Sequence, residues 1–308
     1  MENGKLSKEE LELYKSFEPN TIGNCQNYLR LLSDVYFEMI AGIQMNRKVG
    51  DDFQEHIANL TMQMFFTKAL STMELLGGIG YKKNNIELNS IVDHSLLFII
   101  ARNYCEMVAA YEVLFLLPNS DEKRKIMENL FLSSGYSYKT QLYSDTMIME
   151  NKGQYESEQT IIASAKEFIY SSKYYGSLSP EYQEILDKAL ERKDYKLKLG
   201  NKKVQRLSWQ KCLNHFARKN KALEGLYAYL SLHAHPSIIG IEQYNAAFEI
   251  NDPKFVSLCT TACRYIISFM SMFLQEYIKL FPLAKEIFDK KTDFEKCLLT
   301  MYDYRKNK

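Results

Sequence analysis

The stretch SLLFIIARNYCEMVAAYEVLFLL, residues 95–117, is the most apolar part of the chain and indicates its fold class. Its apolar residues recur at helical spacing and surround the helix on all sides, as in a buried helix. The stretch is long enough to cross a bilayer, but it carries Arg102, Asn103, Glu106 and Glu112. A charged side chain near the centre of a span costs about 2.5–3.5 kcal/mol on insertion scales. We therefore predict a helix that is buried in protein and not in lipid.

Helical spacing continues through most of the sequence, and almost no segment alternates with a period of two. All six prolines fall at inferred helix ends or beginnings, where a missing N–H is harmless. The sequence predicts an all-α multi-helix bundle. The expected helices cover 22–46, 51–76, 90–117, 120–132, 138–171, 180–194, 208–219, 221–234, 238–250, 253–280 and 283–302. The polar, tyrosine-rich segment 138–175 could form a long exposed helix or an arm.

Composition excludes several broad classes of protein. The chain has 308 residues, of which 46% are hydrophobic and 25% are charged, so disorder throughout is excluded. Six cysteines in a chain of this length do not form a disulfide framework, and we expect small buried thiols. The first residues contain no apolar signal core, which favours a cytoplasmic protein.

Charge is segregated along the chain. Residues 188–221 contain twelve Lys and Arg against two acids, a local charge of +10. The whole chain has a net charge of +1, so the remaining residues carry −9. Such asymmetry is typical of a protein with a polyanionic partner, although a solvated helical junction has the same pattern. If the partner is RNA, the candidate contacts are Lys196, Lys198, Lys202, Lys203, Arg206 and Lys211.

The first polar constellation is Arg102-x-x-x-Glu106 within the apolar helix. Residues four apart lie about 40° apart on one helix face, so the two side chains can pair. Their apolar neighbours indicate that the pair is at least half desolvated, and buried charges need partners or a purpose. Two interpretations stay open: a salt bridge that fixes helix packing, or a Glu106 that orients Arg102 toward an anion.

The second constellation is Tyr227-x-x-x-Ser231-x-x-x-His235, which is followed by a proline. Steps of four place these side chains on one helix stripe, and His235 falls at the C-terminal end, where the helix dipole favours an imidazolium. The stripe indicates catalysis or ligand binding, whereas a capping or core histidine is the alternative. His233 points about 200° away, so we expect it on the surface or in packing.

Other kinds of site have little support. The sequence contains no GxGxxG, GxxxxGK[ST], HExxH, ExxH or GxSxG pattern. We therefore expect neither a metal site nor a cofactor.

These motifs resemble a known group of proteins. The Arg102-x-x-x-Glu106 helix and the later run Tyr227-x-x-Leu230-Ser231-x-x-x-His235 resemble a poorly characterised bacterial family of helical proteins. That family is similar to the HEPN superfamily (higher eukaryotes and prokaryotes nucleotide-binding). The resemblance covers about residues 90–280. It implies N-terminal helices over 1–88, a HEPN-like core over 89–282 and a C-terminal helix and tail over 283–308.

The resemblance also implies a function. HEPN-like proteins are frequently dimeric, act in antiviral defence or toxin–antitoxin systems, and are commonly metal-independent ribonucleases. In the enzymes an Arg and a His lie on one helix as Arg-x4–6-His. This chain has no such pair before His235, so Arg102 and His235 would come from different helices or from two subunits.

We therefore expect a metal-independent RNA endonuclease that works as a homodimer or with a partner protein. His235 would act as general base or acid. Arg102 would stabilise charge on the phosphorane, and Glu106 would hold Arg102. Tyr227 and Ser231 would position the phosphate or His235. The alternative is a non-catalytic module that binds a protein or a nucleotide signal, with the same residues as a buried network.

Overall fold

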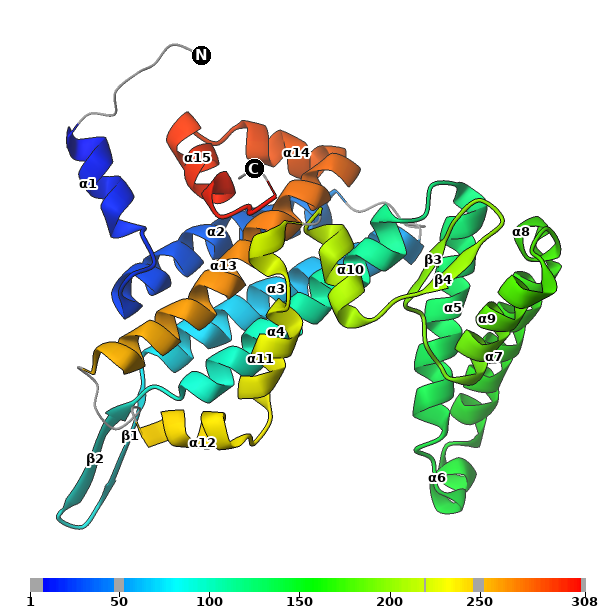
Figure 1. Cartoon of the computed structure of the whole chain (residues 1–308), viewed down its shortest axis with the longest axis horizontal. Coiled ribbons are helices and arrows are strands. Elements are labelled where there is room, and N and C mark those ends of the chain that lie inside the picture. Colours follow the sequence, from blue (N-terminus) through cyan, green and yellow to red (C-terminus); the bar gives the residue numbers. More distant parts are fainter. Residues whose placement is uncertain (1–7, 47–52, 219, 246–251, 306–308) are drawn as a thin grey trace. The chain divides into compact units, whose positions relative to one another are not determined.

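The computed structural model describes residues 8–46, 53–218, 220–245 and 252–305, and it is all-α (Figure 1). Within these residues the chain forms fifteen α-helices and two short antiparallel hairpins. The predicted all-α class is confirmed. A HEPN-like arrangement of the core stays a prediction.

The chain divides into two compact units. Unit 1 contains residues 1–108 and 217–308, and unit 2 contains residues 109–216. The first boundary lies inside α4, and the second follows α10. The expected segments 1–88, 89–282 and 283–308 are a different kind of division and stay a prediction.

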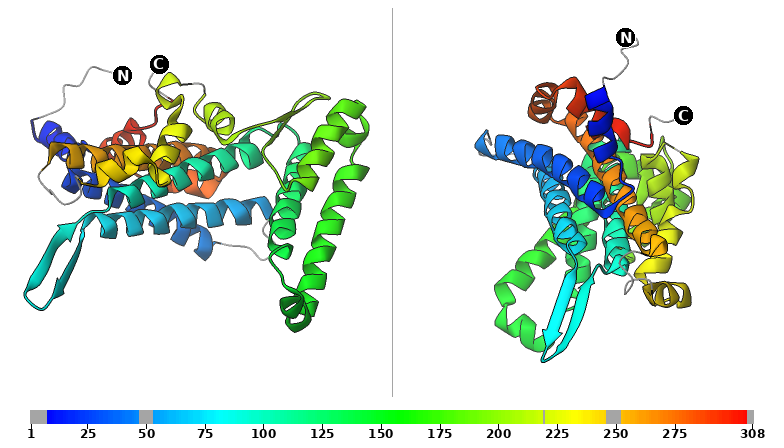
Figure 2. Two further views of the ribbon diagram at one scale, coloured as in Figure 1. Left: turned by 60° about the horizontal axis from the view of Figure 1, so that its bottom comes forward. Right: turned by 90° about the vertical axis from the view of Figure 1, so that its left-hand side faces the viewer.

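Unit 1 is built from long helices that run side by side (Figures 1 and 2). A hairpin of β1 and β2 projects from them, with Tyr81 paired to Leu88. The elements that lie in unit 1 or begin there are α1 (Lys8–Ser16), α2 (Ile22–Met45), α3 (Phe53–Leu76), β1 (Ile79–Lys83), β2 (Ile86–Ile91), α4 (His94–Tyr111), a 3-10 turn (Lys221–Leu223), α11 (Leu226–Ala234), α12 (Ile238–Gln243), α13 (Pro253–Leu280), α14 (Pro282–Asp289) and α15 (Asp293–Met301).

Aromatic side chains form the centre of unit 1. The rings of Phe65 and Phe273 stack at 4.3 Å between centroids, and Tyr104 meets Phe65 edge-on at 4.9 Å. Buried hydroxyls bond to backbone carbonyls, as where Tyr36 donates to Met270 O at 2.8 Å. These contacts join α2, α3, α4 and α13. Helix α13 is long and apolar enough to cross a membrane by length and composition alone, and 67% of that window is buried within the protein.

Unit 2 is organised around the pair α5 and α7, with a hairpin of β3 and β4. Its core includes Ile126, Leu130, Ile169, Leu186 and Cys212. Its elements are a π-helical turn (Glu112–Leu116), α5 (Asp121–Thr140), α6 (Asp145–Glu150), α7 (Lys152–Ser171), α8 (Lys173–Gly176), α9 (Pro180–Glu191), β3 (Leu197–Leu199), β4 (Val204–Arg206) and α10 (Trp209–Phe216).

Several expected helix boundaries are wrong for identifiable reasons. The helix expected over 90–117 begins only at residue 94, because 86–91 is a strand. The expected gap between 132 and 138 is absent, because Ser133 and Ser134 are buried inside a continuous α5. The tyrosine-rich segment is neither one long helix nor an arm, since α6, α7 and α8 follow one another there.

Three further predictions need correction. The helix expected over 221–234 is interrupted at Gly225, which has a left-handed φ of +72°. The helix expected over 283–302 is two helices, because Thr292 and Glu295 form a capping box that starts α15. The residues of β3 and β4 were not predicted as strands. The expected helix ends at 51–52 and 246–250 lie outside the described residues.

Candidate functional site

Helix α4 carries Arg102 and Glu106, and its start is fixed by a cap. The Asp93 carboxylate accepts hydrogen bonds from the backbone N–H groups of Ser95 at 2.9 Å and Leu96 at 3.3 Å. On another face of the helix, the Tyr104 hydroxyl donates to Phe65 O at 2.7 Å. Arg102 and Glu106 are therefore held at defined positions, with side chains 23% and 26% exposed. The expected partial desolvation of the pair is confirmed.

Helix α11 carries Tyr227 and ends directly before His235. Leu226 and Leu230 are buried and fix this helix on unit 1, while Tyr227 is half-buried. His235 has an extended backbone, with φ −109° and ψ 152°, and its N–H donates to Ser231 O at 3.2 Å. The exposed imidazole thus follows the last helical residue instead of lying on the helix itself.

Four of the five predicted catalytic side chains meet in one cluster, which we name the Arg102 cluster: Arg102, Glu106, Tyr227 and His235. Arg102 Nε donates to Glu106 Oε1 at 3.1 Å, and Arg102 Nη2 donates to the Tyr227 hydroxyl at 2.9 Å. That hydroxyl donates in turn to Glu106 Oε1 at 3.0 Å. Arg102 Nη1 lies 2.7 Å from His235 Nε2. The cluster lies entirely within unit 1 and within one copy of the chain.

Burial and neighbouring groups shift the pKa of two members of the cluster. Partial burial alone would lower the pKa of Arg102, but hydrogen bonds and charge from Tyr227 and Glu106 outweigh it and raise that pKa. Burial also raises the pKa of Tyr227, with a smaller contribution from Glu106. A guanidinium has only donors, so His235 Nε2 is the acceptor in the contact with Arg102.

Ser231 does not join the cluster. Its hydroxyl donates to the carbonyl of Tyr227 on its own helix at 2.7 Å. Serine commonly bonds back to the carbonyl four residues earlier in a helix. Helical spacing placed this residue on the correct stripe but could not show that its hydroxyl turns to the backbone.

The basic residues predicted to bind RNA fall into two groups within unit 2. Lys196 Nζ and Arg206 Nε both pair with the buried carboxylate of Asp194. Burial would raise the pKa of Asp194, but these two partners outweigh it and lower that pKa. Lys196, directly before β3, and Arg206, the last residue of β4, thus share one carboxylate beside the hairpin. The remaining four are exposed or partly exposed, and the described part of the chain offers them no ion pair: Lys198, Lys202, Lys203 and Lys211.

A pocket of about 490 Å³ adjoins His235, and we name it the His235 pocket. Its walls come from α4, from the end of α11 and from α12. Sequence reasoning did not identify this pocket, because its walls come from segments that lie far apart in the chain. Its lining includes Ser95, Ile99, His233, His235, Ile241 and Tyr244.

Two buried histidines lie near this pocket. His233 is 5% exposed and stacks on Phe98 at 4.1 Å, so it is a packing residue and not a surface residue. His94 is 1% exposed, and its Nδ1 has no hydrogen-bond partner among the residues that the structure describes. Burial lowers the pKa of both, although Asp93 opposes the shift at His94. The position of His94 directly after the capping residue Asp93 was the sequence signal that could have identified it.

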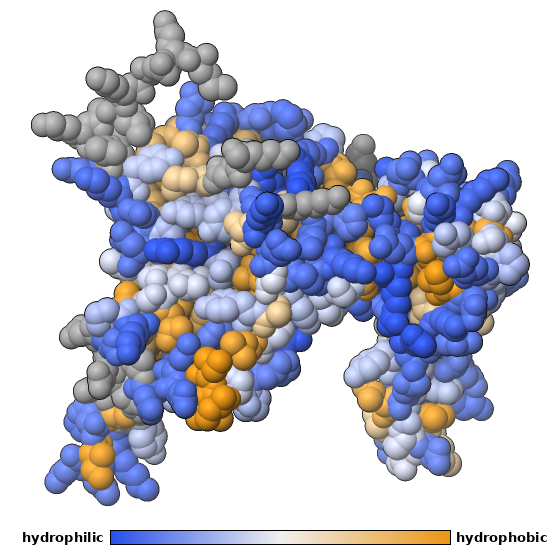
Figure 3. All heavy atoms as spheres, viewed as in Figure 1, coloured by the Kyte–Doolittle hydropathy of each residue, from blue (hydrophilic) through white to orange (hydrophobic). Residues whose placement is uncertain are grey.

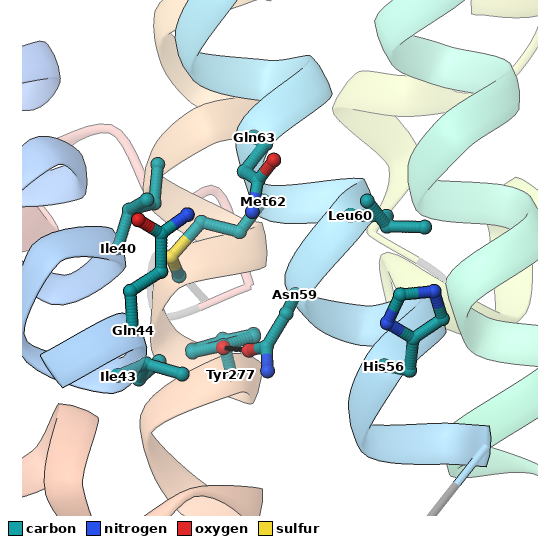
Figure 4. Close-up of a pocket in the computed structure, with 9 residues that line it drawn as sticks. All are labelled: Ile40, Ile43, Gln44, His56, Asn59, Leu60, Met62, Gln63 and Tyr277. Carbon is teal, nitrogen blue, oxygen red and sulfur yellow. Dashed lines mark hydrogen bonds between the residues drawn. The ribbon is translucent and has the colours of Figure 1, made fainter. Parts of the chain in front are cut away.

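A second pocket lies between α2, α3 and α13, away from the cluster (Figure 4). Its volume of about 60 Å³ leaves room for only a few water molecules. Tyr277 donates to Asn59 at its floor, while His56 lies at its edge. This pocket is too small for a nucleotide.

The described residues contain no candidate metal site. In the described parts of the chain, no three His, Cys, Asp or Glu side chains gather as a metal site would require. Five cysteines are buried and free, as expected, whereas Cys297 is exposed.

No protein-family model matches the chain, and no curated protein or solved structure matches it either.

Proposed function

We propose that the Arg102 cluster is the active site of a metal-independent RNA endonuclease. The observation that carries the proposal is the 2.7 Å contact between Arg102 Nη1 and His235 Nε2, two residues 133 positions apart in the sequence. A guanidinium and an imidazole at the open edge of a pocket can contact one phosphodiester together. The resemblance to HEPN-like proteins supports the same activity, and it suggests a role in antiviral defence or in a toxin–antitoxin system.

The chemistry uses the groups as the structure presents them. His235 Nε2 takes the proton of the ribose 2′-hydroxyl, and the 2′-oxygen attacks the adjacent phosphorus. Arg102 donates to the non-bridging oxygens, where negative charge grows in the transition state. The bond from phosphorus to the 5′-oxygen then breaks, and the 5′-oxygen takes a proton from the imidazolium. The products are a 2′,3′-cyclic phosphate and a 5′-hydroxyl, and none of these steps requires a metal ion.

Glu106 and Tyr227 hold Arg102 and do not contact the phosphate in this mechanism. Both lie on the Nε and Nη2 side of the guanidinium, which leaves the Nη1 edge toward His235. A phosphate would replace the direct contact between Arg102 and His235. Lys198, Lys202, Lys203 and Lys211, which form no ion pair within the described residues, would attract the RNA backbone by charge alone.

A second candidate function has its own support. Each nitrogen of the Arg102 guanidinium already has a partner, as in a network that only fixes α4 against α11. In that case the chain would be a non-catalytic binding or regulatory module. Disruption of a structural network would lower the free energy of unfolding. Disruption of an active site would lower the reaction rate and leave the free energy of unfolding unchanged.

The test is RNA cleavage by the purified chain in the presence of a metal chelator. We expect fragments that end in a 2′,3′-cyclic phosphate, and loss of cleavage in the Arg102→Lys variant, which keeps the charge but loses the planar fork. Circular dichroism melting of the variant is the control for folding. Absence of cleavage by the wild-type chain, or fragments with 3′-hydroxyl ends, would contradict the proposal.

A further inference from the structure

We infer that the His235 pocket binds the unpaired base of the nucleotide whose phosphate contacts Arg102 and His235. The inference rests on the proposed function for the position of the phosphate. It adds that the enzyme selects single-stranded or looped RNA, and that residues of α12 read the base.

The His235 pocket and the Arg102 cluster adjoin each other. His235 belongs to both sites, because its Nε2 contacts Arg102 and the residue also lines the pocket. Ile99, one helical turn before Arg102 on α4, also lines the pocket. A ligand with its phosphate on Arg102 therefore has its attached group at the pocket mouth.

The lining of the His235 pocket is uncharged and rich in rings. The described residues that form it include no Lys, Arg, Asp or Glu, so the pocket is suited to an uncharged group. Apolar side chains and rings predominate, and two hydroxyls and an amide supply polar contacts, as in most small-molecule sites. An anionic subsite beside an uncharged, ring-lined one fits a nucleotide. The side chains that give the lining this character are Ser95, Ile99, His233, Ile241, Tyr244 and Asn245.

The His235 pocket is large enough for a base, and part of its lining is held in place by ring contacts. A volume of about 490 Å³ lies within the range of about 300–1,000 Å³ that is usual for small-molecule sites. His233 is held between Phe98, at 4.1 Å, and the edge of Tyr229, at 4.8 Å. Burial lowers the pKa of His233 and so favours its neutral ring, which has one donor and one acceptor nitrogen.

Helix α12 exposes an apolar surface beside the pocket. Ile238, Ile239 and Ile241 are 69%, 43% and 60% exposed, and apolar atoms gather over this helix (Figure 3). Ile241 lines the pocket, whereas Ile238 on the same helix does not. A base in the pocket would cover Ile241. It would also have to leave any duplex stack to enter, which is why the substrate must be unpaired there.

The experiment is calorimetric titration of the full chain with the four nucleoside 3′-monophosphates, ribose 5-phosphate and inorganic phosphate. We expect at least one nucleotide to bind about tenfold more tightly than ribose 5-phosphate, as base stacking on side chains typically provides. Ile241→Trp, which fills the pocket, should remove that advantage. Ile238→Trp, the matched control on the same helix, should keep it.

The outcomes separate this inference from the proposed function. Ribose 5-phosphate that binds as tightly as every nucleotide, equal losses in the two variants, or no binding of any probe would overturn the pocket assignment. Base-dependent binding by a chain that cleaves no RNA would support the pocket and refute the nuclease. RNA cleavage without base-dependent binding would support the nuclease and refute the pocket assignment.

Discussion

At the scale of single residues, the Arg102 cluster shows what helical spacing can and cannot provide. A spacing of four correctly placed Arg102 and Glu106 on one helix face, whereas His235, predicted on the same helix stripe as Tyr227, follows the end of α11. The contact between the two pairs depends on how α4 and α11 pack, which no local pattern encodes. The direction of the Ser231 hydroxyl and the burial of His94 likewise depend on neighbours that are distant in sequence.

The first prediction concerns the bridging hydroxyl of Tyr227. Tyr227→Phe removes the group that accepts from Arg102 and donates to Glu106. A hydrogen bond to a charged group contributes about 1.5–3 kcal/mol, so the cleavage rate should fall at least about tenfold. KM should change little, because the lost hydroxyl positions Arg102 and does not contact the RNA.

Tyr229→Phe is the matched control, since it removes a hydroxyl from the same helix but outside the cluster. Its cleavage rate should stay at the wild-type value. Equal rates for both variants and the wild type would refute a positioning role for Tyr227.

The second prediction concerns the buried histidines His94 and His233, whose pKa values lie below the ordinary 6.5. Below about pH 6.5 the unfolded chain takes up protons at these positions first, so acid favours unfolding. The free energy of unfolding should therefore decrease between about pH 7 and pH 5. Each histidine contributes a slope of up to about 1.4 kcal/mol per pH unit.

His233→Phe keeps a ring on Phe98 but cannot titrate. Urea denaturation across this pH range should give a shallower slope for this variant than for the wild type. Identical slopes would show that His233 does not titrate differently in the folded and unfolded chain.

At the scale of elements, the long helices of unit 1 were predictable and the short elements were not. The predicted helices over 22–46 and 253–280 match α2 and α13 to within one residue at each end. Each carries strong apolar periodicity, and Asp252 caps α13 with a proline following it. The hairpins are too short and too polar to show a period of two, and their pairing depends on turns and on ion pairs such as those of Asp194.

The third prediction tests the break before α11. Gly225 has a φ of +72°, and an added Cβ would meet no atom within 4 Å. Gly225→Ala therefore costs only the strain of a left-handed backbone, about 1–2 kcal/mol in the free energy of unfolding. The measurement is urea denaturation.

Gly23→Ala is the control, because Gly23 lies within α2 and also has free space around it. That variant should be as stable as the wild type or more stable. Equal effects of the two substitutions would mean that the turn at Gly225 is not strained by a side chain.

At the scale of the whole molecule, a net charge of +1 conceals a basic block in an otherwise acidic chain. Most of the block, residues 188–216, belongs to unit 2, and the remainder begins the second part of unit 1. Part of its charge stabilises the β3–β4 hairpin through Asp194. The cations left for a polyanion are fewer than the sequence alone indicated.

The fourth prediction tests whether the remaining exposed cations contact RNA. The double substitution Lys202→Ala and Lys203→Ala removes two exposed charges from the β3–β4 turn. If both contact RNA, the slope of log K against log salt for single-stranded RNA should become shallower by about 1.4. Lys83→Ala with Lys290→Ala removes the same charge elsewhere and should leave the slope unchanged. Equal slopes in both double variants would exclude the turn as an RNA contact.

The most direct test of the central claim is the single-turnover rate of RNA cleavage by His235→Ala, measured together with its melting temperature. If His235 is the general base, the rate should fall by about 10²–10⁴-fold. The melting temperature should stay close to that of the wild type, because this imidazole is exposed. His56→Ala, outside the cluster, should cleave at the wild-type rate. A His235→Ala variant that cleaves as fast as the wild type would contradict the account.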